Sequence, residues 1–411
     1  MRLLHTADWH VGRTLMNVPR QPDIEAAVDE VLAIAREQRP DLVVHAGDLF
    51  DAVRPATQDM HWAIDRLREL AELAPVFVLC GNHDSPALFA LFDKLLGPRS
   101  RVRFVPYPLP PDRGGVIEVP GPGSEVIRLA PVPFIHSSRI VRFFEDPATW
   151  MTDYADRVAT VLRTLDAGLQ RGYDGARHVL LLAAHLFVTG ARFSQSERPL
   201  TVTDAYATRS EHLPAVTYSA YGHIHRPQPL PGTGTGRYAG SLVPLDFGER
   251  DETKEVVMVE ARPGRPPRLQ SIPLAGGRPL RQLEGTLEEL ARIGPGVGSA
   301  LCLVTVRTES PTPDLSERVG GLLPDAVLLD IFEDSATKRL TALDGQDVAG
   351  EREASFTELF RDYLSATGVR AGSADRVLRT FETLIAAVEN EEQAVMPDVE
   401  ELESAVPPEL P

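Results

Sequence analysis

The chain has 411 residues, of which 43% are hydrophobic, and carries a formal net charge of -17. This length provides for two or three domains with sizeable cores, and the composition excludes a disordered protein. The negative charge excludes a protein that coats nucleic acid through bulk positive charge. A nucleic-acid enzyme stays possible, because bound metal ions and local arginines can reverse the field at one site.

The first residues lack the apolar core of a signal peptide, and no apolar run approaches the length of a membrane span. Two cysteines, Cys80 and Cys302, lie inside strand-like runs and are expected to be buried thiols. We therefore expect a cytoplasmic protein without a membrane segment.

The first part of the chain alternates apolar runs with amphipathic helices. This order predicts parallel strands joined by right-handed crossovers. Strands are expected at 3–7, 41–46 and 75–79, with helices at 22–39 and 57–73.

The middle of the chain has less regular spacing. A segment rich in Pro and Gly at 106–124 predicts turns and a hairpin. Two runs, 238–242 and 255–259, are expected to form an antiparallel pair. Further strands are expected at 102–104, 126–129, 178–184 and 216–221, with a helix at 152–170 and a loop at 189–212.

Beyond a boundary at 261–279, the pattern at 280–335 alternates strand and helix and predicts a small second domain. From Glu391 the chain is acidic and rich in Pro, which favours disorder. The expected domains are 1–275, 276–340 and 341–411. The last contains a linker, helices at 354–366 and 374–390, and the acidic tail.

Polar side chains able to bind metal follow five of the expected strands. The carboxyl ends of parallel strands meet at one edge of a sheet, where open α/β sheets bind ligands. Two pairs are spaced two apart and so project to one side of an extended segment. The donors are Asp8, His10, Asp48, Asn82, His185, His223 and His225.

This set contains two carboxylates, one amide and four imidazoles. Oxygen and nitrogen donors without thiolates suit Mn²⁺, Mg²⁺, Fe or Zn²⁺. Seven donors are too many for one tetrahedral ion. Two ions that share a carboxylate fit better, as in phosphoester hydrolases, where such ions lie about 3.5–4 Å apart. We expect Asp48 to be shared, because it has two oxygens and follows the central strand.

Each side chain also has a plainer interpretation when taken alone. A histidine can be a packed core residue, Asp48 can cap the next helix, and Asn82 can be a turn residue. This interpretation fails for the set, because five strand ends in sequence order each supply donors. The other six histidines are expected to be core or supporting residues, with His5 and His45 inside strands.

Five motifs resemble those of the calcineurin-like metallophosphoesterase superfamily. They are Asp8-x-His10, Gly47-Asp48, Gly81-Asn82-His83-Asp84, His185 and Gly222-His223-x-His225. Within it, residues 5–10, 46–51 and 222–226 resemble the SbcD family of bacterial nuclease subunits, as do Gly240-Ser241 and the order of domains. Archaeal relatives carry a histidine where this chain has Asp51, so a second catalytic histidine is not carried over to that position.

The resemblance implies an α/β fold. A metallophosphoesterase β-sandwich core flanked by helices would be followed by a small α/β capping domain and C-terminal helices. It also implies two divalent cations, with Mn²⁺ expected. One would be held by Asp8, His10, Asp48 and His225, and the other by Asp48, Asn82, His185 and His223.

Such ions activate water for in-line attack on a phosphoester. His83 is expected to be catalytic by donating a hydrogen bond or proton toward the phosphate and the leaving oxygen. Asp84 is expected to assist by fixing the tautomer of His83.

The same resemblance implies a DNA exonuclease and endonuclease that acts in DNA repair and recombination. Its partners would be DNA and a coiled-coil ATPase of the SbcC type. We expect a homodimer, to which the helix at 57–73 could contribute, and a nucleoid-associated heterotetramer with the ATPase. The helices at 354–366 and 374–390 either dock on the ATPase or pack on their own domain. Arg13, Arg54 and Arg192 are expected to contact DNA phosphates.

Two other functions stay open at this point. A small-molecule or cyclic-nucleotide phosphodiesterase would use the same ligands, and the site residues alone do not choose the substrate. A DNA-tethering subunit without activity is disfavoured, because every ligand position and His83 are present.

Overall fold

The computed structural model describes residues 1–136, 154–194, 196–197, 207–232 and 235–335, together with positions 361, 377, 378 and 381. Met1–Ser335 forms one compact unit. The predicted linker, both C-terminal helices and the acidic tail lie outside the described residues, apart from those four positions.

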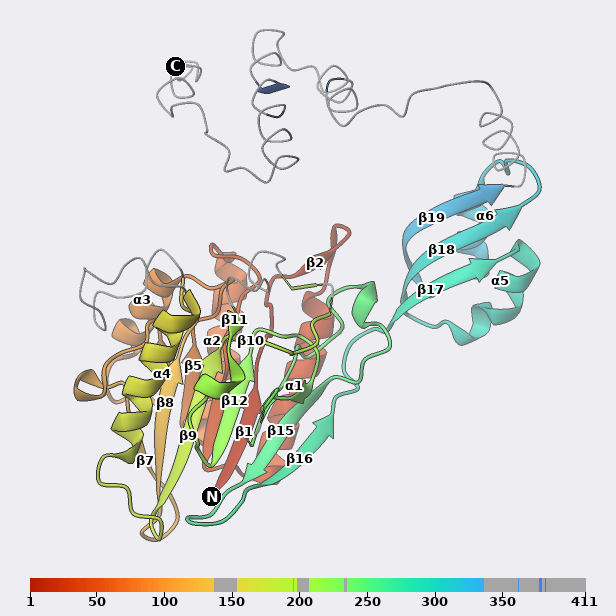
Figure 1. Ribbon diagram of the computed structural model, residues 1–411. Helices are drawn as coiled ribbons and strands as arrows, with labels where there is room; N and C mark the ends of the chain where they lie inside the picture. The colour runs from red at the N-terminus through yellow and green to blue at the C-terminus, as the bar shows by residue number, and fades with distance from the viewer. Residues whose placement is uncertain are drawn as a thin grey trace, which may run out of the picture. The chain divides into compact units, whose positions relative to one another are not determined.

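The body of this unit contains two six-stranded sheets (Figure 1). In the first sheet β1, β4, β5 and β6 run parallel, as the alternation of strand and helix predicts. Strand β15 joins β1 antiparallel and pairs with β16 at the edge. In spatial order the strands are β16 (Arg268–Pro273), β15 (Glu255–Glu260), β1 (Arg2–Thr6), β4 (Leu42–His45), β5 (Val76–Leu79) and β6 (Val102–Val105).

In the second sheet β8, β9, β12 and β14 run parallel, and antiparallel strands close both edges. In spatial order the strands are β13 (Gln228–Pro229), β14 (Gly236–Tyr238), β12 (Tyr218–Gly222), β9 (His178–His185), β8 (Val126–Val132) and β7 (Ile117–Pro120). Both faces of the central strands are covered, so β8 and β9 are buried along their whole length.

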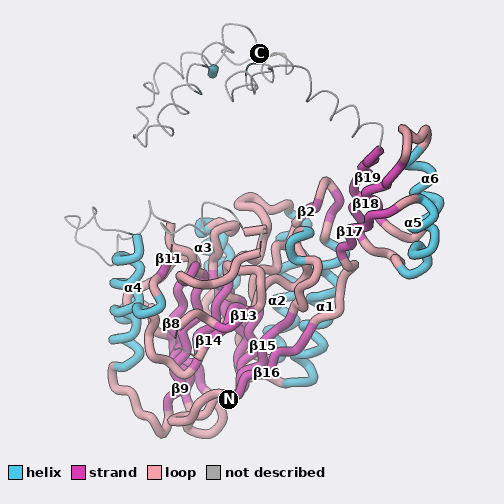
Figure 2. Tube along the Cα trace, turned by 45° about the vertical axis from the view of Figure 1, so that its right-hand side comes forward, coloured by secondary structure: helices cyan, strands magenta, loops and turns pink. Residues whose placement is uncertain are grey.

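The two sheets pack face to face with helices on the outside (Figure 2). Between the sheets, Val44 and Leu79 of the first meet Leu129 and Leu181 of the second in one apolar cluster. A second cluster packs helices α1, α2 and α3 on the first sheet, and a third packs α4 on the second. The helices are α1 (Gln21–Gln38), α2 (Thr57–Leu73), α3 (Pro86–Leu96) and α4 (Tyr154–Gln170).

Residues 280–335 form a three-stranded parallel sheet with its own core. Helix α5 begins at a capping box, in which Thr286 and Glu289 satisfy each other's backbone amides. At the other face of the sheet, Leu280 and Leu301 pack with Leu15 of the main body. The elements are β17 (Leu280–Gly285), α5 (Leu287–Ile293), β18 (Leu301–Thr308), α6 (Leu315–Leu322) and β19 (Val327–Ser335).

The predicted antiparallel pairing of 238–242 with 255–259 is wrong. Tyr238 is buried in the second sheet, where its hydroxyl donates to the Leu186 carbonyl and accepts from the Val188 amide. That anchoring keeps β14 beside β12, while β15 pairs with β1 in the other sheet.

The structure bears on two further expectations, about the cysteines and about membrane-spanning helices. Cys80 and Cys302 are buried free thiols, as predicted. Among the helices of the described part of the chain, none combines the length and apolarity needed to cross a membrane.

Candidate metal centre

Five strands end close together, and the donors lie at those ends. Asp8 and His10 follow β1, Asp48 follows β4, Asn82 follows β5, His185 ends β9, and His223 and His225 follow β12. All seven side chains are buried. The structure therefore brings together every residue that the sequence motifs single out as a donor.

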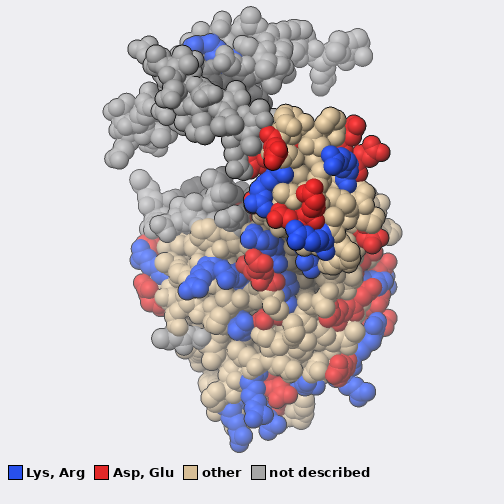
Figure 3. All heavy atoms as spheres, turned by 90° about the vertical axis from the view of Figure 1, so that its right-hand side faces the viewer, with Lys and Arg blue, Asp and Glu red and all other residues tan. Residues whose placement is uncertain are grey.

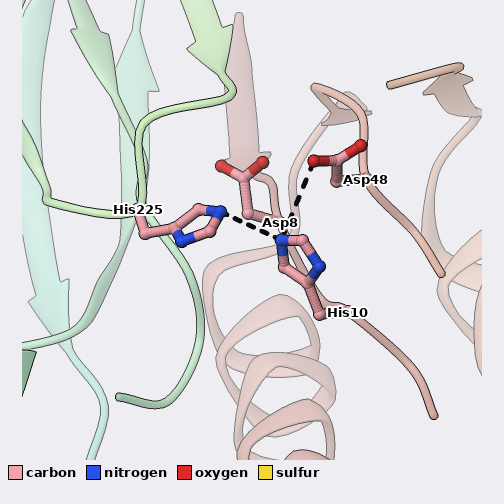
Figure 4. A group of neighbouring side chains, drawn as sticks. All are labelled: Asp8, His10, Asp48 and His225. Atoms are coloured by element: carbon pink, nitrogen blue, oxygen red, sulfur yellow. Dashed lines mark hydrogen bonds and ion pairs between the residues drawn. The ribbon is translucent and has the colours of Figure 1, made fainter. Parts of the chain in front are cut away.

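Four of the donors form one tight group (Figure 4). One ligand atom each from Asp8, His10, Asp48 and His225 lies within 4.8 Å of the others. The Nε2 atom of His10 is 3.0 Å from Nε2 of His225 and 3.8 Å from Oδ2 of Asp48. Two carboxylates and two imidazoles thus converge on one small volume, as the ligands of a divalent cation do.

A second group lies on the other side of Asp48. Asn82 Oδ1 is 2.9 Å from Nε2 of His185 and 2.7 Å from Nδ1 of His223. His185 Nε2 is also 3.4 Å from Oδ2 of Asp48. The same Asp48 oxygen therefore faces both groups, as a carboxylate shared by two cations requires.

Four donors have a positive backbone φ, which is uncommon for residues other than glycine. The φ angles are 51° at Asp8, 49° at His10, 53° at Asp48 and 94° at His223. Residues other than glycine rarely adopt positive φ, and each such residue costs about 1–3 kcal/mol. Hydrogen bonds hold this geometry, because Asp8 N–H donates to the Gly47 carbonyl and His10 N–H to the Asp48 carbonyl.

Two glycines of the motifs are required by close approach. A Cβ atom on Gly47 would collide with the His185 ring, and one on Gly81 would collide with the Asp48 carboxylate and amide. Gly47 also has a φ of 101°, which only glycine adopts readily. Glycine at these two positions thus allows the backbone to approach the side chains of His185 and Asp48 closely.

Charge and burial shift the pKa values of the donors. Burial opposes the charge on His185, but Asp48 outweighs it and raises the pKa of His185 to about 9. Burial also opposes the charge on His225, and Glu249 raises the pKa of His225 to about 9. Burial raises the pKa of Asp8 to about 7, whereas the pKa of Asp48 is lowered well below its usual value, because His185 outweighs its burial.

Hydrogen bonds outside the donor groups orient two of the rings. His185 Nδ1 lies 2.8 Å from the Ala46 carbonyl and donates to it, so Nε2, which faces Asp48 and Asn82, is the atom that can give up its proton and bind a cation. His10 Nδ1 lies 3.2 Å from Asp51 Oδ1, which leaves Nε2 for the first group. Such outer contacts fix the tautomer of metal-binding histidines.

His83 lies beside the first group, with its ring centroid 4.7 Å from that of His10. The prediction that Asp84 fixes its tautomer is wrong. His83 Nδ1 instead lies 2.8 Å from the main-chain carbonyl of Asp51. The Asp84 carboxylate accepts hydrogen bonds from the amides of Leu49, Phe50 and Gly81, so it ties two ligand loops together.

Several neighbours of the centre were missed by the sequence reasoning. Asp51 contacts both His10 and Arg13; burial opposes its ionisation, but the nearby His10 lowers the pKa of Asp51 to about 2. Phe134 places its ring 5.7 Å from His223. Glu249 lies near His225 although it follows no strand. Only Asp51 had a signal in the sequence, because it ends the motif at 46–51, but its contacts with His10 and Arg13 were not predicted.

The remaining predicted positions have plainer surroundings. His5 is a buried supporting residue, as expected, with Nδ1 3.0 Å from the Tyr218 hydroxyl. Arg13 forms an ion pair with Asp51 at 3.2 Å, whereas Arg54 and Arg192 are exposed. Figure 3 shows acidic and basic side chains interspersed over one face of the protein, without a continuous basic surface on that face.

Sequence comparisons place the chain among known proteins. The profile of the calcineurin-like phosphoesterases matches residues 1–227, and the SbcD_C profile, described as the type 5 capsule protein repressor C-terminal domain, matches residues 277–367. The SbcD subunit of nuclease SbcCD from Bacillus subtilis is 32% identical over 286 residues, covering 68% of this chain and 71% of that protein.

Two further similarities are weaker. The SbcD subunit of nuclease SbcCD from Escherichia coli K12 is 24% identical and covers 96% of this chain and 100% of that protein. The structure of a dimetal phosphatase from Danio rerio aligns with 66% of this chain and 98% of that protein, at 15% identity and a TM-score of 0.38. The two matching profiles and the 32% identity suffice: the chain belongs to the calcineurin-like phosphoesterases and, within them, to the SbcD family of nuclease subunits.

Proposed function

We propose that this protein is the nuclease subunit of an SbcCD-type DNA repair complex and hydrolyses DNA phosphodiesters at a centre of two divalent cations. The observation that carries the proposal is the pair of donor groups that share Asp48 Oδ2. Membership of the SbcD family of nuclease subunits supports DNA as the substrate.

The donor geometry supports one assignment of ligands. Asp8, His10, Asp48 and His225 would hold the first cation, and Asp48, Asn82, His185 and His223 the second. The donors are oxygen and nitrogen atoms only, which fits a hard or borderline cation. We propose Mn²⁺ as the physiological ion.

When bound, the two cations supply Lewis acidity, which lowers the pKa of a water molecule and offsets the charge of the phosphodiester. The protein's own residues orient these groups. The ring of His185 is fixed by the Ala46 carbonyl, and the ring of His10 by Asp51. Burial of all the donors excludes bulk water from the carboxylates and strengthens their interaction with charge.

His83 would act on the leaving group. Because Nδ1 of His83 donates to the Asp51 carbonyl, Nε2 is the atom that can exchange a proton with the leaving oxygen. Asp51 and Asp84 would support this step indirectly. The carbonyl of Asp51 orients the ring, and the carboxylate of Asp84 holds the loop that carries it.

The test of the proposed function is cleavage of linear double-stranded DNA, with Mn²⁺ and after chelation, in the presence and absence of an SbcC-type ATPase and ATP. We expect cleavage that requires the metal. Turnover of a simple chromogenic phosphodiester far above DNA cleavage would instead indicate a small-molecule or cyclic-nucleotide phosphodiesterase. Metal binding without any hydrolysis would indicate a tethering subunit.

Exposed arginines are our candidates for contacts with DNA phosphates. Arg54 and Arg192 have exposed side chains, whereas the guanidinium of Arg13 is engaged by Asp51. We therefore assign direct phosphate contact to Arg54 and Arg192 and leave Arg13 a supporting role. Replacing either exposed arginine with alanine should reduce the salt dependence of DNA binding by about one unit of slope.

Metal binding should depend on pH. The pKa values of His185 and His225 are about 9 in the metal-free protein, and both rings must lose a proton to bind a cation. Protons therefore compete with the metal below pH 9, and affinity should rise between pH 6.5 and about 9 and level off above. Calorimetric titration with Mn²⁺ at pH 7.5, in buffers of different ionisation enthalpy, should show release of about two protons. Uptake without proton release would contradict the assignment.

A homodimer would need an exposed apolar surface, and α3 provides one. Leu91 and Leu95 are 48% and 73% exposed and lie one turn apart. The apolar face of α2, which the sequence suggested, is instead occupied, because Leu67 and Leu70 are buried. We propose that the dimer forms through α3.

The double variant Leu91→Glu/Leu95→Glu should raise the dimer dissociation constant by about a hundred-fold or more, since burial of each leucine contributes about 1.5–3 kcal/mol. Light scattering after size exclusion should then give the mass of one chain, while metal content stays unchanged. A dimer that survives both substitutions would rule out this surface.

We retain the predicted division at 275/276 and 340/341 as a proposal, supported by the separate core of residues 280–335. The segment 341–411 would bind the coiled-coil ATPase and complete a heterotetramer in the nucleoid of the cytoplasm. A chain that ends at residue 340 should lose ATPase binding in a pull-down while it keeps its metal. Undiminished binding would exclude the segment as the docking site.

A further inference from the structure

Glu249 is a buried carboxylate that no sequence motif includes. It lies in a short 3-10 helix, Phe247–Glu249, and is 0% exposed. Burying an ionised carboxylate is costly unless hydrogen bonds compensate. Its two oxygens have different partners, and the difference determines what the side chain can do.

The Oε2 atom of Glu249 has three neighbouring donors, one of which is the Ser241 hydroxyl at 3.2 Å. Lys254 Nζ lies at 2.6 Å and the Leu245 amide nitrogen at 3.1 Å. Lys254 is itself buried and also donates to the main-chain carbonyl of His225 at 2.9 Å. Because of Lys254, the pKa of Glu249 lies far below its usual value although burial opposes ionisation. One lysine thus holds both the carboxylate and the backbone of His225.

The Oε1 atom of Glu249 faces the ring of His225. Its distance to His225 Nδ1 is 3.5 Å, and Ser196 Oγ bridges the two groups with a hydrogen bond to each. A carboxylate can only accept, so the Ser196 hydroxyl donates to Glu249. The hydroxyl oxygen must then accept from His225, which places the ring proton on Nδ1. The other ring nitrogen, Nε2, lies 3.0 Å from Nε2 of His10 and is the atom left for a cation in the first donor group.

We propose that Glu249 is a positioning residue that, through Ser196, fixes His225 in the tautomer whose Nε2 can bind a cation. The proposal rests on the proposed two-cation centre and extends it to a residue outside the donor set. Outer partners of this kind typically change metal affinity by about 10–100-fold.

The variant Glu249→Gln gives a sharp test, because the amide has one acceptor and one donor end. Lys254 and the Leu245 amide would draw the amide oxygen to their side, so the amide nitrogen would face Ser196 and donate to it. Ser196 would then donate to His225 Nδ1, and the ring proton would move to Nε2. The near-isosteric substitution should therefore reverse the tautomer without leaving a cavity.

The experiment measures Mn²⁺ binding to the metal-free full chain by calorimetry and by electron paramagnetic resonance, with the melting temperature as a check on folding. We expect Glu249→Gln to weaken the binding of one of the two Mn²⁺ ions by about 10–100-fold. Glu249→Ala should lower the melting temperature more but weaken that ion less. If Glu249 had a purely structural role, the variant with the lower melting temperature, Glu249→Ala, should also bind Mn²⁺ more weakly than Glu249→Gln. Nitrogen chemical shifts of His225 in the metal-free protein, recorded above pH 9 where the ring is neutral, should report the proton on Nδ1 in the wild type and on Nε2 in Glu249→Gln.

The matched control is Glu252→Gln, which removes a carboxylate 2.9 Å from the same lysine but without a hydrogen bond to Ser196 or His225. It should bind both ions as the wild type does. Wild-type affinity for both ions in Glu249→Gln would overturn the inference and leave the proposed function intact. Failure of the wild type to bind two ions would overturn the proposed function itself.

Discussion

Replacing Asp48 with alanine should abolish binding of both cations and lower the rate of DNA cleavage by about a thousand-fold or more. One Asp48 oxygen faces His10 and His185, which belong to different donor groups, so its loss would remove a ligand from each of the two proposed cations. Metal ions contribute several kcal/mol of transition-state stabilisation, and about 4 kcal/mol corresponds to a thousand-fold. Elemental analysis of the purified variant and cleavage of linear duplex DNA measure the two effects.

Asp48 also has a backbone role that must be separated from metal binding. Its Oδ1 accepts from the His83 amide, and its φ is positive. Asp48→Asn keeps an acceptor and tolerates this conformation, so it should fold normally and still lose metal. Asp93→Asn removes a carboxylate that binds Arg103 away from the centre and should change neither measurement. Two metal ions per chain in Asp48→Ala would contradict the assignment of Asp48 as a ligand shared by both cations.

His83→Gln should retain both cations and DNA affinity and lower the cleavage rate by about 10²–10⁴-fold, the range for loss of a general acid. Glutamine can still donate to the Asp51 carbonyl, which His83 Nδ1 contacts at 2.8 Å, so the loop should keep its position. It cannot exchange a proton with the leaving oxygen. Single-turnover cleavage with saturating Mn²⁺ would separate this loss from any change in binding.

The matched control is His178→Gln at the opposite end of β9 from His185. His178 accepts from the Asp174 amide and touches no donor of the centre. It should cleave at the wild-type rate. Full activity in His83→Gln, with metal and DNA binding unchanged, would remove His83 from the mechanism.

The position of the four donors that follow β1, β4 and β5 is predictable from the sequence because it depends on local pattern, whereas the three at the ends of β9 and β12 belong to the other sheet. An apolar run followed by Gly-Asp, as at Gly47-Asp48, marks the end of a buried strand. Parallel pairing then brings such ends to one edge of a sheet. Nothing beyond strand order is needed to predict that Asp8, Asp48 and Asn82 are neighbours.

Pairing between distant segments could not be predicted in the same way. The runs at 236–238 and 255–260 are both good strands, but nothing local tells which sheet each joins. The role of Asp84 was mistaken for the same reason. Asp84 is next to His83 in the sequence, but its carboxylate accepts hydrogen bonds from the amides of Leu49 and Phe50, which only the fold brings near. Glu249, Ser196 and His225 come from three separate segments of the chain that only the fold brings together. No spacing in the sequence therefore indicates the role of Glu249.

The left-handed backbone at Asp8, His10, Asp48 and His223 has an evolutionary consequence. Glycine would adopt these angles without strain, so at each position the resident side chain makes folding less favourable by about 1–3 kcal/mol. A descendant that no longer cut DNA could lose this strain by drifting to glycine at His10, whereas glycine at Asp8 or Asp48 would leave the buried amide of His223 or His83 without its carboxylate partner. At His10 the side chain thus contributes to the donor group at a cost in stability, whereas the two aspartates serve both the donor group and the fold.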